Sequence, residues 1–195
     1  MNRTTALIII IILAIIIALF YFFFYFSQHD LGGWRFNFSL SKVKTNDYQS
    51  FGPKLAFKYP DIFEIDSDPQ KKYGDNYVVG IKLKTDSRTG CDIRKGGPML
   101  DYSKSIDELT ENAISQIRDK AKDFQLIEKE KINIAGRDGF KTSFSFLDPI
   151  GARVRLDQIF TQNEGINYMI ICGAGEYQFD FFRKDFNILY DSLTF

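Results

Sequence analysis

The pattern of hydrophobic and polar positions separates an apolar N-terminal stretch from a long region in which apolar and polar residues alternate. Residues 6–26 read ALIIIIILAIIIALFYFFFYF, without a charge, a proline or a glycine. At a rise of about 1.5 Å per residue, a helix of this length spans roughly 30 Å, the thickness of a bilayer hydrocarbon core. The pattern therefore predicts a transmembrane anchor from Ala6 to Phe26, preceded by an N-terminal tail of residues 1–5.

A cleaved signal peptide is the alternative interpretation of this stretch. Its apolar region would be shorter, about 7 to 15 residues, and would lead into a cleavage site of small residues. Here the apolar run passes through aromatic residues into Ser27, Gln28 and His29, which favours an uncleaved anchor. Basic residues stand on both sides of the anchor, at Arg3 and Arg35, so the charge rule does not decide its orientation.

The residues after the anchor divide into a linker and a domain. Residues 27–50 contain glycine, serine, asparagine and isolated aromatics without a sustained period, which predicts a juxtamembrane linker. Residues 51–195 are numerous enough for one domain with its own hydrophobic core. Within them, the stretch 85–104 is polar and rich in glycine, and predicts a long loop.

Apolar periodicity predicts two helices and a series of strands in this domain. The clearest helix covers 105–124, where Ser105 and Glu108 form a capping box and apolar residues recur at steps of three and four. A second helix is predicted at 179–195. Alternating or continuous apolar runs predict strands at 55–60, 63–68, 77–84, 126–134, 140–146, 154–160 and 168–172.

The order of these elements indicates the fold class. Four of the strands follow one another through short turns, which favours antiparallel neighbours. The two helices interrupt the runs of strands without strict alternation between strand and helix. This order predicts an α+β fold with a mainly antiparallel sheet.

Charge and chemistry exclude several classes of function. Lys plus Arg (25) equals Asp plus Glu (25), so the chain lacks the basic surplus that is typical of nucleic-acid binding. The only histidine, His29, lies in the linker, so a Ser-His-Asp or Cys-His mechanism would lack its base inside the domain. Two cysteines 81 positions apart, with no histidine nearby, do not predict a zinc site.

The two cysteines leave two possibilities open. Cys91, in the predicted loop, and Cys172, in a predicted central strand, form a disulfide if the domain lies outside the cytoplasm and the sulfurs meet. They are otherwise two free thiols, with Cys172 a small core residue. The sequence does not decide between these possibilities.

Several segments resemble, in the same order, the PsbP-like domains. These segments are the strand LAFKYPDIF, the helix SIDELTENAI, the turn AGRDGF, the strand GINYMIICGAGE and the final segment FNILYDSLTF, and the similarity covers about residues 50–195. The resemblance implies an α/β/α sandwich, in which helices flank an antiparallel sheet, and a position outside the cytoplasm. Well-known members are extrinsic subunits of the oxygen-evolving photosystem. The predicted anchor departs from those subunits, so the resemblance implies only an accessory or binding role.

The leading hypothesis is a membrane-tethered, non-enzymatic module that binds a protein partner outside the cytoplasm, without a cofactor, a metal or nucleic acid. Its candidate interaction surface is the predicted loop, with Arg88, Arg94 and Lys95. Two alternatives remain: a domain with a small-ligand pocket between sheet and helix, and a hydrolase that uses carboxylates only.

Overall fold

The computed structural model describes residues 43–50, 54–66, 76–96 and 103–195. Residues 43–195 belong to one compact unit, and the predicted tail, anchor and most of the predicted linker lie outside the described residues. No helix in the described ranges is both long and apolar enough to cross a membrane. The elements are β1 (Thr45–Ser50), β2 (Leu55–Pro60), β3 (Phe63–Ile65), β4 (Tyr77–Leu83), β5 (Asp86–Lys95), α3 (Ile106–Lys120), β6 (Lys122–Ile134), β7 (Arg137–Leu147), β8 (Arg153–Asn163), β9 (Ile166–Gly175) and α4 (Glu176–Ser192).

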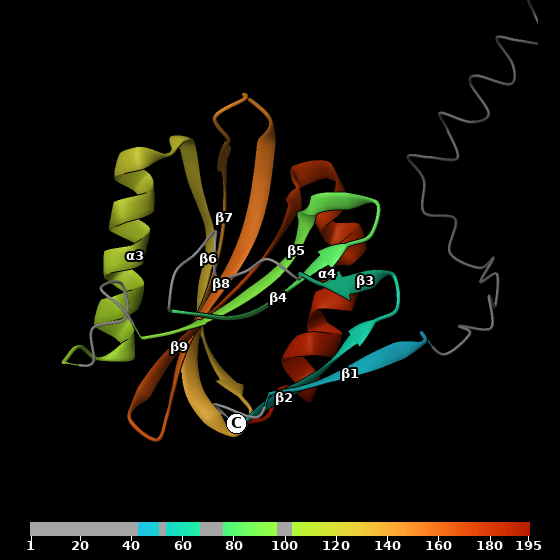
Figure 1. The fold of residues 1–195 in the computed structure, drawn as a ribbon. Coiled ribbons are helices and arrows are strands. Elements are labelled where there is room, and N and C mark those ends of the chain that lie inside the picture. Colours follow the sequence, from blue (N-terminus) through green and yellow to red (C-terminus); the bar gives the residue numbers. More distant parts are fainter. Residues whose placement is uncertain (1–42, 51–53, 67–75, 97–102) are drawn as a thin grey trace, which may run out of the picture. The chain divides into compact units, whose positions relative to one another are not determined.

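Seven strands form one antiparallel sheet in the order β3-β4-β5-β9-β8-β7-β6, and β1 pairs with β2 as a separate hairpin (Figure 1). The strands from β6 to β9 are consecutive in the chain and are joined by short turns, as their spacing predicts. The central pair, β5 and β9, joins the N-terminal strands to this four-stranded part. The predicted α+β class and mainly antiparallel sheet are confirmed.

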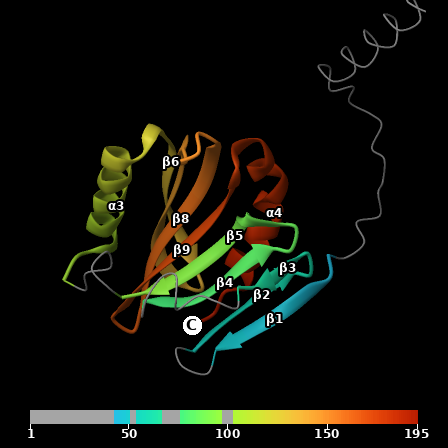
Figure 2. The same ribbon diagram turned by 45° about the horizontal axis from the view of Figure 1, so that its top comes forward.

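The two helices pack on opposite faces of the sheet (Figure 2). Helix α3 contacts β6, β7 and β8, and its Leu109 and Ala113 pack against Phe160 and Met169. Helix α4 contacts β2, β8 and β9 and covers the larger core, which contains its buried Phe179, Phe182, Phe186 and Leu189. Strand β8 is therefore contacted by a helix on each of its faces.

Helix α3 begins where the sequence predicts and ends earlier. The Ser105 hydroxyl accepts a hydrogen bond from the Glu108 backbone N–H, and the Glu108 carboxylate accepts one from the Ser105 N–H, so the predicted capping box is present. The helix ends at Lys120, because Ala121 is extended and Asp123 has a positive φ of 57°. Phe124, predicted to be helical, lies in β6, where its ring packs on Phe144.

The predicted loop at 85–104 is wrong over half its length, because Asp86–Lys95 is strand β5. Thr89, Cys91 and Ile93 alternate inward and are buried. Polar residues occupy the other positions of the strand, and they hide its apolar period in the sequence. The segment predicted as a linker likewise contains a strand, β1, which pairs along its full length with β2.

The sheet has two unequal edges. Strand β3 forms one edge and has only three residues. Strand β6 forms the other, with 13 residues, and its pairing with β7 shifts register between Lys122 and Gln125 and again between Leu126 and Glu128. In its middle, β6 alternates acidic with basic residues, in the order Glu128, Lys129, Glu130 and Lys131.

Candidate functional site

A disulfide joins the two central strands. Cys91 of β5 and Cys172 of β9 are direct partners in the sheet, with Cα atoms 4.0 Å apart, and their sulfurs are bonded. Their residues are 3% and 0% exposed, so the bond is sealed in the core beneath α4. Of the two possibilities that the sequence leaves open, the structure has the disulfide.

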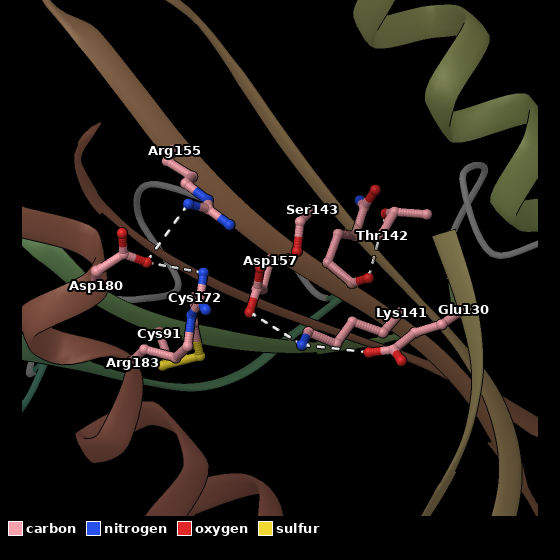
Figure 3. Close-up of polar contacts among 11 residues, drawn as sticks. Cys91, Glu130, Lys141, Thr142, Ser143, Arg155, Asp157, Cys172, Asp180 and Arg183 are labelled. Atoms are coloured by element: carbon pink, nitrogen blue, oxygen red, sulfur yellow. Dashed lines mark hydrogen bonds and ion pairs between the residues drawn. A yellow bond between two sulfur atoms is a disulfide. The ribbon is translucent and has the colours of Figure 1, made fainter. Parts of the chain in front are cut away.

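A buried polar cluster lies beside this disulfide, on the same face of the sheet (Figure 3). Asp157 of β8 is the strand partner of Cys172 and is only 2% exposed. The Ser143 hydroxyl donates a hydrogen bond of 2.5 Å to the Asp157 carboxylate. The Lys141 ammonium lies 3.6 Å from the same carboxylate and 3.4 Å from that of Glu130. The sequence pattern places Lys141, Ser143 and Asp157 opposite the apolar face of their strands, and the packing of α4 on that face explains the burial of Asp157.

The cluster contains residue types that hydrolases use, but a substrate has no access to them. Ser143 and Asp157 are each 2% exposed, so a substrate cannot reach either group in this conformation. The Lys141 ammonium lies between the carboxylates of Asp157 and Glu130 and offsets the charge of buried Asp157, which is the arrangement of a structural ion-pair network. Its direct effect is to stabilise the pairing of β6, β7 and β8.

Tyr190 of α4 adds a phenol to this environment. Burial of its hydroxyl raises the pKa of Tyr190 well above its ordinary value of 10.0, and the negative charge of Asp157 raises this pKa further. The hydroxyl has no hydrogen-bond partner within the described part of the chain. Tyr190 is therefore a neutral phenol at every physiological pH.

A second, more exposed charge group links α4 to the sheet. The Asp180 carboxylate lies 3.5 Å from Arg155 of β8 and 2.8 Å from Arg183 (Figure 3). Both guanidiniums stand over the Phe179 ring. The Asp180 side chain is 70% exposed, so its ion pairs contribute little to stability. The cation–π contact of Arg155 with the buried Phe179 ring joins β8 to α4.

A polar hollow of about 300 Å³ opens on the other face of the sheet, over β4, β5 and β9. Gly90 and Gly173 form part of its floor, and a side chain at either position would collide with the Ile81 carbonyl oxygen or with Leu156. The remaining lining residues are Asp66, Ile81, Lys82, Ser87, Arg88, Cys91, Asp92, Leu156 and Ile171.

The three predicted interaction residues lie on β5 rather than on a loop. Arg88 lines the polar hollow, and its side chain is 68% exposed and lies 3.4 Å from the Asp86 carboxylate. Arg94 is half-buried and lies 3.3 Å from Asp92. Lys95, also half-buried, pairs across to β9. The structure therefore separates Arg88 from the other two along the strand.

A larger hollow of about 480 Å³ lies between the C-terminal end of α3 and the β7–β8 turn. It lies between helix and sheet, where the ligand-binding alternative requires a pocket. Its lining is mainly apolar and consists of Gln116, Ile117, Lys120, Ala121, Lys122, Phe146, Leu147, Asp148 and Pro149. Among the residues that the structure describes, no group of three or more His, Cys, Asp or Glu side chains could hold a metal ion.

Comparison with known proteins shows the family. The profile of the PsbP-like protein family matches residues 6–195, nearly the entire chain. The chain belongs to the PsbP-like protein family. The resemblance found in the sequence is thus confirmed, and the family match extends through the apolar N-terminal stretch of this PsbP-like protein. No curated protein sequence matches it.

Solved structures share the fold of this PsbP-like protein. The solution structure of cyanobacterial PsbP (CyanoP) from Synechocystis sp. PCC 6803 has a TM-score of 0.56 and 12% identity, over 86% of this chain and 98% of that chain. The crystal structure of LpqN, involved in cell envelope biogenesis of Mycobacterium tuberculosis, has a TM-score of 0.54 and 12% identity, over 77% and 90%. At these identities the similarity shows a common fold alone.

Proposed function

We propose that this PsbP-like protein is a membrane-tethered accessory module that acts outside the cytoplasm and binds a protein partner. The observation that carries the proposal is the buried disulfide between Cys91 and Cys172. Disulfides form and persist in oxidising compartments and are rare in the cytosol. The uncharged stretch 6–26, which has the length of a membrane span, supports the tether.

A non-enzymatic role is supported by the state of the polar groups. Ser143 and Asp157 are buried and bonded to each other, and Lys141 is held between two carboxylates. The interactions of these groups join strands β6, β7 and β8. The carboxylate-only hydrolase requires an acid and a base that both reach a cleft, and Asp157 does not.

The polar hollow on the sheet is the binding surface we favour. Its charges stand as neighbouring pairs: Lys82 lies 3.5 Å from Asp66, and Arg88 lies beside Asp86. A partner with matching charges could exchange these exposed pairs for interfacial ones, which favours specificity and fast association. The glycine floor lets a partner's backbone approach the sheet closely.

Topology is tested by cysteine labelling in intact cells. The native cysteines are buried and bonded, so a membrane-impermeant maleimide does not reach them in the folded domain. The variant Glu128→Cys places a thiol on an exposed position of β6, and Asn2→Cys places one on the other side of the predicted anchor. Labelling of the first variant before lysis and of the second only after lysis is the expected result. The reverse pattern overturns the extracytoplasmic location, and labelling of both before lysis overturns the anchor.

The second candidate is a small-ligand-binding domain, and the hollow of about 480 Å³ beside α3 favours it. Substitution of Ala121 by Trp would fill this hollow. If a ligand binds there, thermal stabilisation by that ligand disappears in the Ala121→Trp variant. It persists in the control variant Ser115→Ala, which changes an exposed position of α3.

A further inference from the structure

Three large apolar side chains protrude from the surface in two neighbouring elements. Ile150, in the turn between β7 and β8, is 79% exposed. Tyr177 and Phe181, one helical turn apart on α4, are 98% and 64% exposed. Exposed apolar residues are ordinary when they are scattered, and they call for an explanation when they gather in one place.

These residues gather at one end of the domain, which we call the turn end. It consists of the β7–β8 turn, the C-terminal end of α3 and the N-terminal turns of α4. Val154 of β8 is the strand partner of Gly175, the residue before α4, and Arg153 lies 3.5 Å from Glu176. Figures 1 and 2 both show the turn and the start of α4 at the same end of the sheet as the C-terminal end of α3.

The β7–β8 turn holds Ile150 in a fixed, outward position. The Asp148 carboxylate accepts hydrogen bonds from the backbone N–H groups of Ile150, at 3.0 Å, and of Ala152, at 2.8 Å. The Gly151 N–H donates to the Asp148 carbonyl at 2.9 Å, and Gly151 takes a positive φ of 84°. An apolar side chain is thus displayed on a preorganised turn, so little conformational entropy is lost when it inserts into an apolar phase.

The charges of the turn end are unequally compensated. Three of its acidic side chains are engaged with arginines: Asp123 and Glu176 pair with Arg153, and Asp180 pairs with Arg183. Within the described chain, Lys120 and Lys122 lie in no ion pair, and Lys184 stands over the Phe181 ring and interacts with the charge of Asp185. The turn end therefore combines protruding apolar groups with two lysines, Lys120 and Lys122, whose charges are free to meet anionic headgroups.

We propose that the turn end docks on the surface of an anionic lipid bilayer, with Ile150, Tyr177 and Phe181 in the interfacial region and the lysines at the headgroups. The proposal rests on the membrane tether of the proposed function. Aromatic side chains favour the headgroup level of a membrane, where an apolar ring and a polar tip are both accommodated. The polar hollow over β4, β5 and β9 is a separate surface that docking leaves for the partner.

Because the predicted anchor holds the domain near the bilayer, a weak contact between the turn end and the lipid is sufficient for docking. Residues 27–44, which are 18 residues long, separate the predicted anchor from β1. A domain of the size of residues 43–195 has a radius of gyration of about 15 Å. A domain joined to an anchor by so short a segment meets the bilayer at an effective concentration on the order of millimolar. A second copy of the chain is a poorer occupant, because three side chains fall far short of the roughly 800 Å² per partner of a stable interface.

Tryptophan quenching in the full chain tests this docking. Trp34 is the only tryptophan, so the Trp34→Phe chain has no tryptophan fluorescence and serves as the background for new tryptophans. Phe181→Trp then reports on the turn end, and Asn133→Trp, at an exposed position at the opposite end of the sheet, is the matched control. Each chain is reconstituted in vesicles of anionic and zwitterionic lipid, with or without brominated acyl chains, and carbonate extraction verifies membrane insertion.

The expected result is loss of fluorescence in brominated vesicles for the Phe181→Trp chain and not for the Asn133→Trp chain. Adding Ile150→Asp should restore the fluorescence, and raising the salt concentration should restore part of it. Equal fluorescence in brominated and plain vesicles, for a chain that resists carbonate extraction, overturns the docking and leaves the tether standing. Release of the chain by carbonate overturns the tether itself. A fluorescence change that follows protein density rather than bromine points to a second copy and overturns the bilayer as the occupant.

Discussion

Removal of the disulfide is the perturbation whose size the structure defines best. Cys91 and Cys172 are separated by 81 positions, so their bond closes more than half of the domain into one loop. In the chain-entropy treatment, a loop of this length stabilises the folded state by about 4.5 kcal/mol. A domain of this size has a free energy of unfolding of roughly 5 to 15 kcal/mol, so the bond supplies a large share of it.

The double variant Cys91→Ala/Cys172→Ala should therefore remain folded but unfold much more readily. Both positions are buried, and alanine leaves only small gaps there. The assay is urea unfolding of the compact unit, residues 43–195, followed by far-ultraviolet circular dichroism. With a slope of about 2 kcal/mol per molar urea, the midpoint should fall by about 2 M.

Reduced native protein is the control for this measurement, because it lacks the cross-link but keeps both sulfur atoms. Its midpoint should lie close to that of the double variant. A loss of stability below about 1 kcal/mol would refute the reasoning, since it would mean that the bond constrains the unfolded chain far less than its loop length requires.

Three further substitutions test local features. Ser143→Ala removes the hydroxyl that donates to buried Asp157, and should cost about 1 to 3 kcal/mol in urea unfolding, with an unchanged fold by circular dichroism. Ser105→Ala breaks the capping box of α3 and should cost about 1 kcal/mol, whereas Ser115→Ala, inside the same helix, should cost nothing. Asp185→Asn should raise the melting temperature at pH 7. Burial raises the pKa of Asp185, so its ionised form opposes folding, and the gain should vanish below about pH 4, where both states are protonated.

The sequence predicts the parts of the fold that depend on local signals. The capping box at Ser105 and Glu108 identifies the start of α3, since both hydrogen bonds are made within one turn. The short turns between β6 and β9 predict an antiparallel meander, because a two- to five-residue connection leaves no other geometry. The family resemblance rests on such turns and core positions.

The missed features depend on what packs against a strand. β5 reads as a polar loop because Arg88, Asp92 and Arg94 face away from the core, while only Thr89, Cys91 and Ile93 face into it. A strand with one polar face and a glycine within it does not show its period clearly until its neighbours are known.

The burial of Asp157 could not be predicted for a related reason. Alternation along β8 assigns it to the polar face, but alternation does not say whether that face meets water or a helix. Helix α4 covers it, and the donors that satisfy it, Ser143 and Lys141, come from β7. The only signal in the sequence is that serine and lysine stand on the same face of the preceding strand, which is too common a pattern to identify a buried cluster.

The edges of the sheet affect how readily copies of the domain aggregate. A long edge strand offers a row of backbone groups to the next molecule, and such rows seed fibrillar aggregation. In β6, two register shifts twist that row, and alternating charges from Glu128 to Lys131 oppose a second strand, while β3 is only three residues long. Both edges of the seven-stranded sheet therefore carry features that oppose the addition of a strand from another copy of the domain.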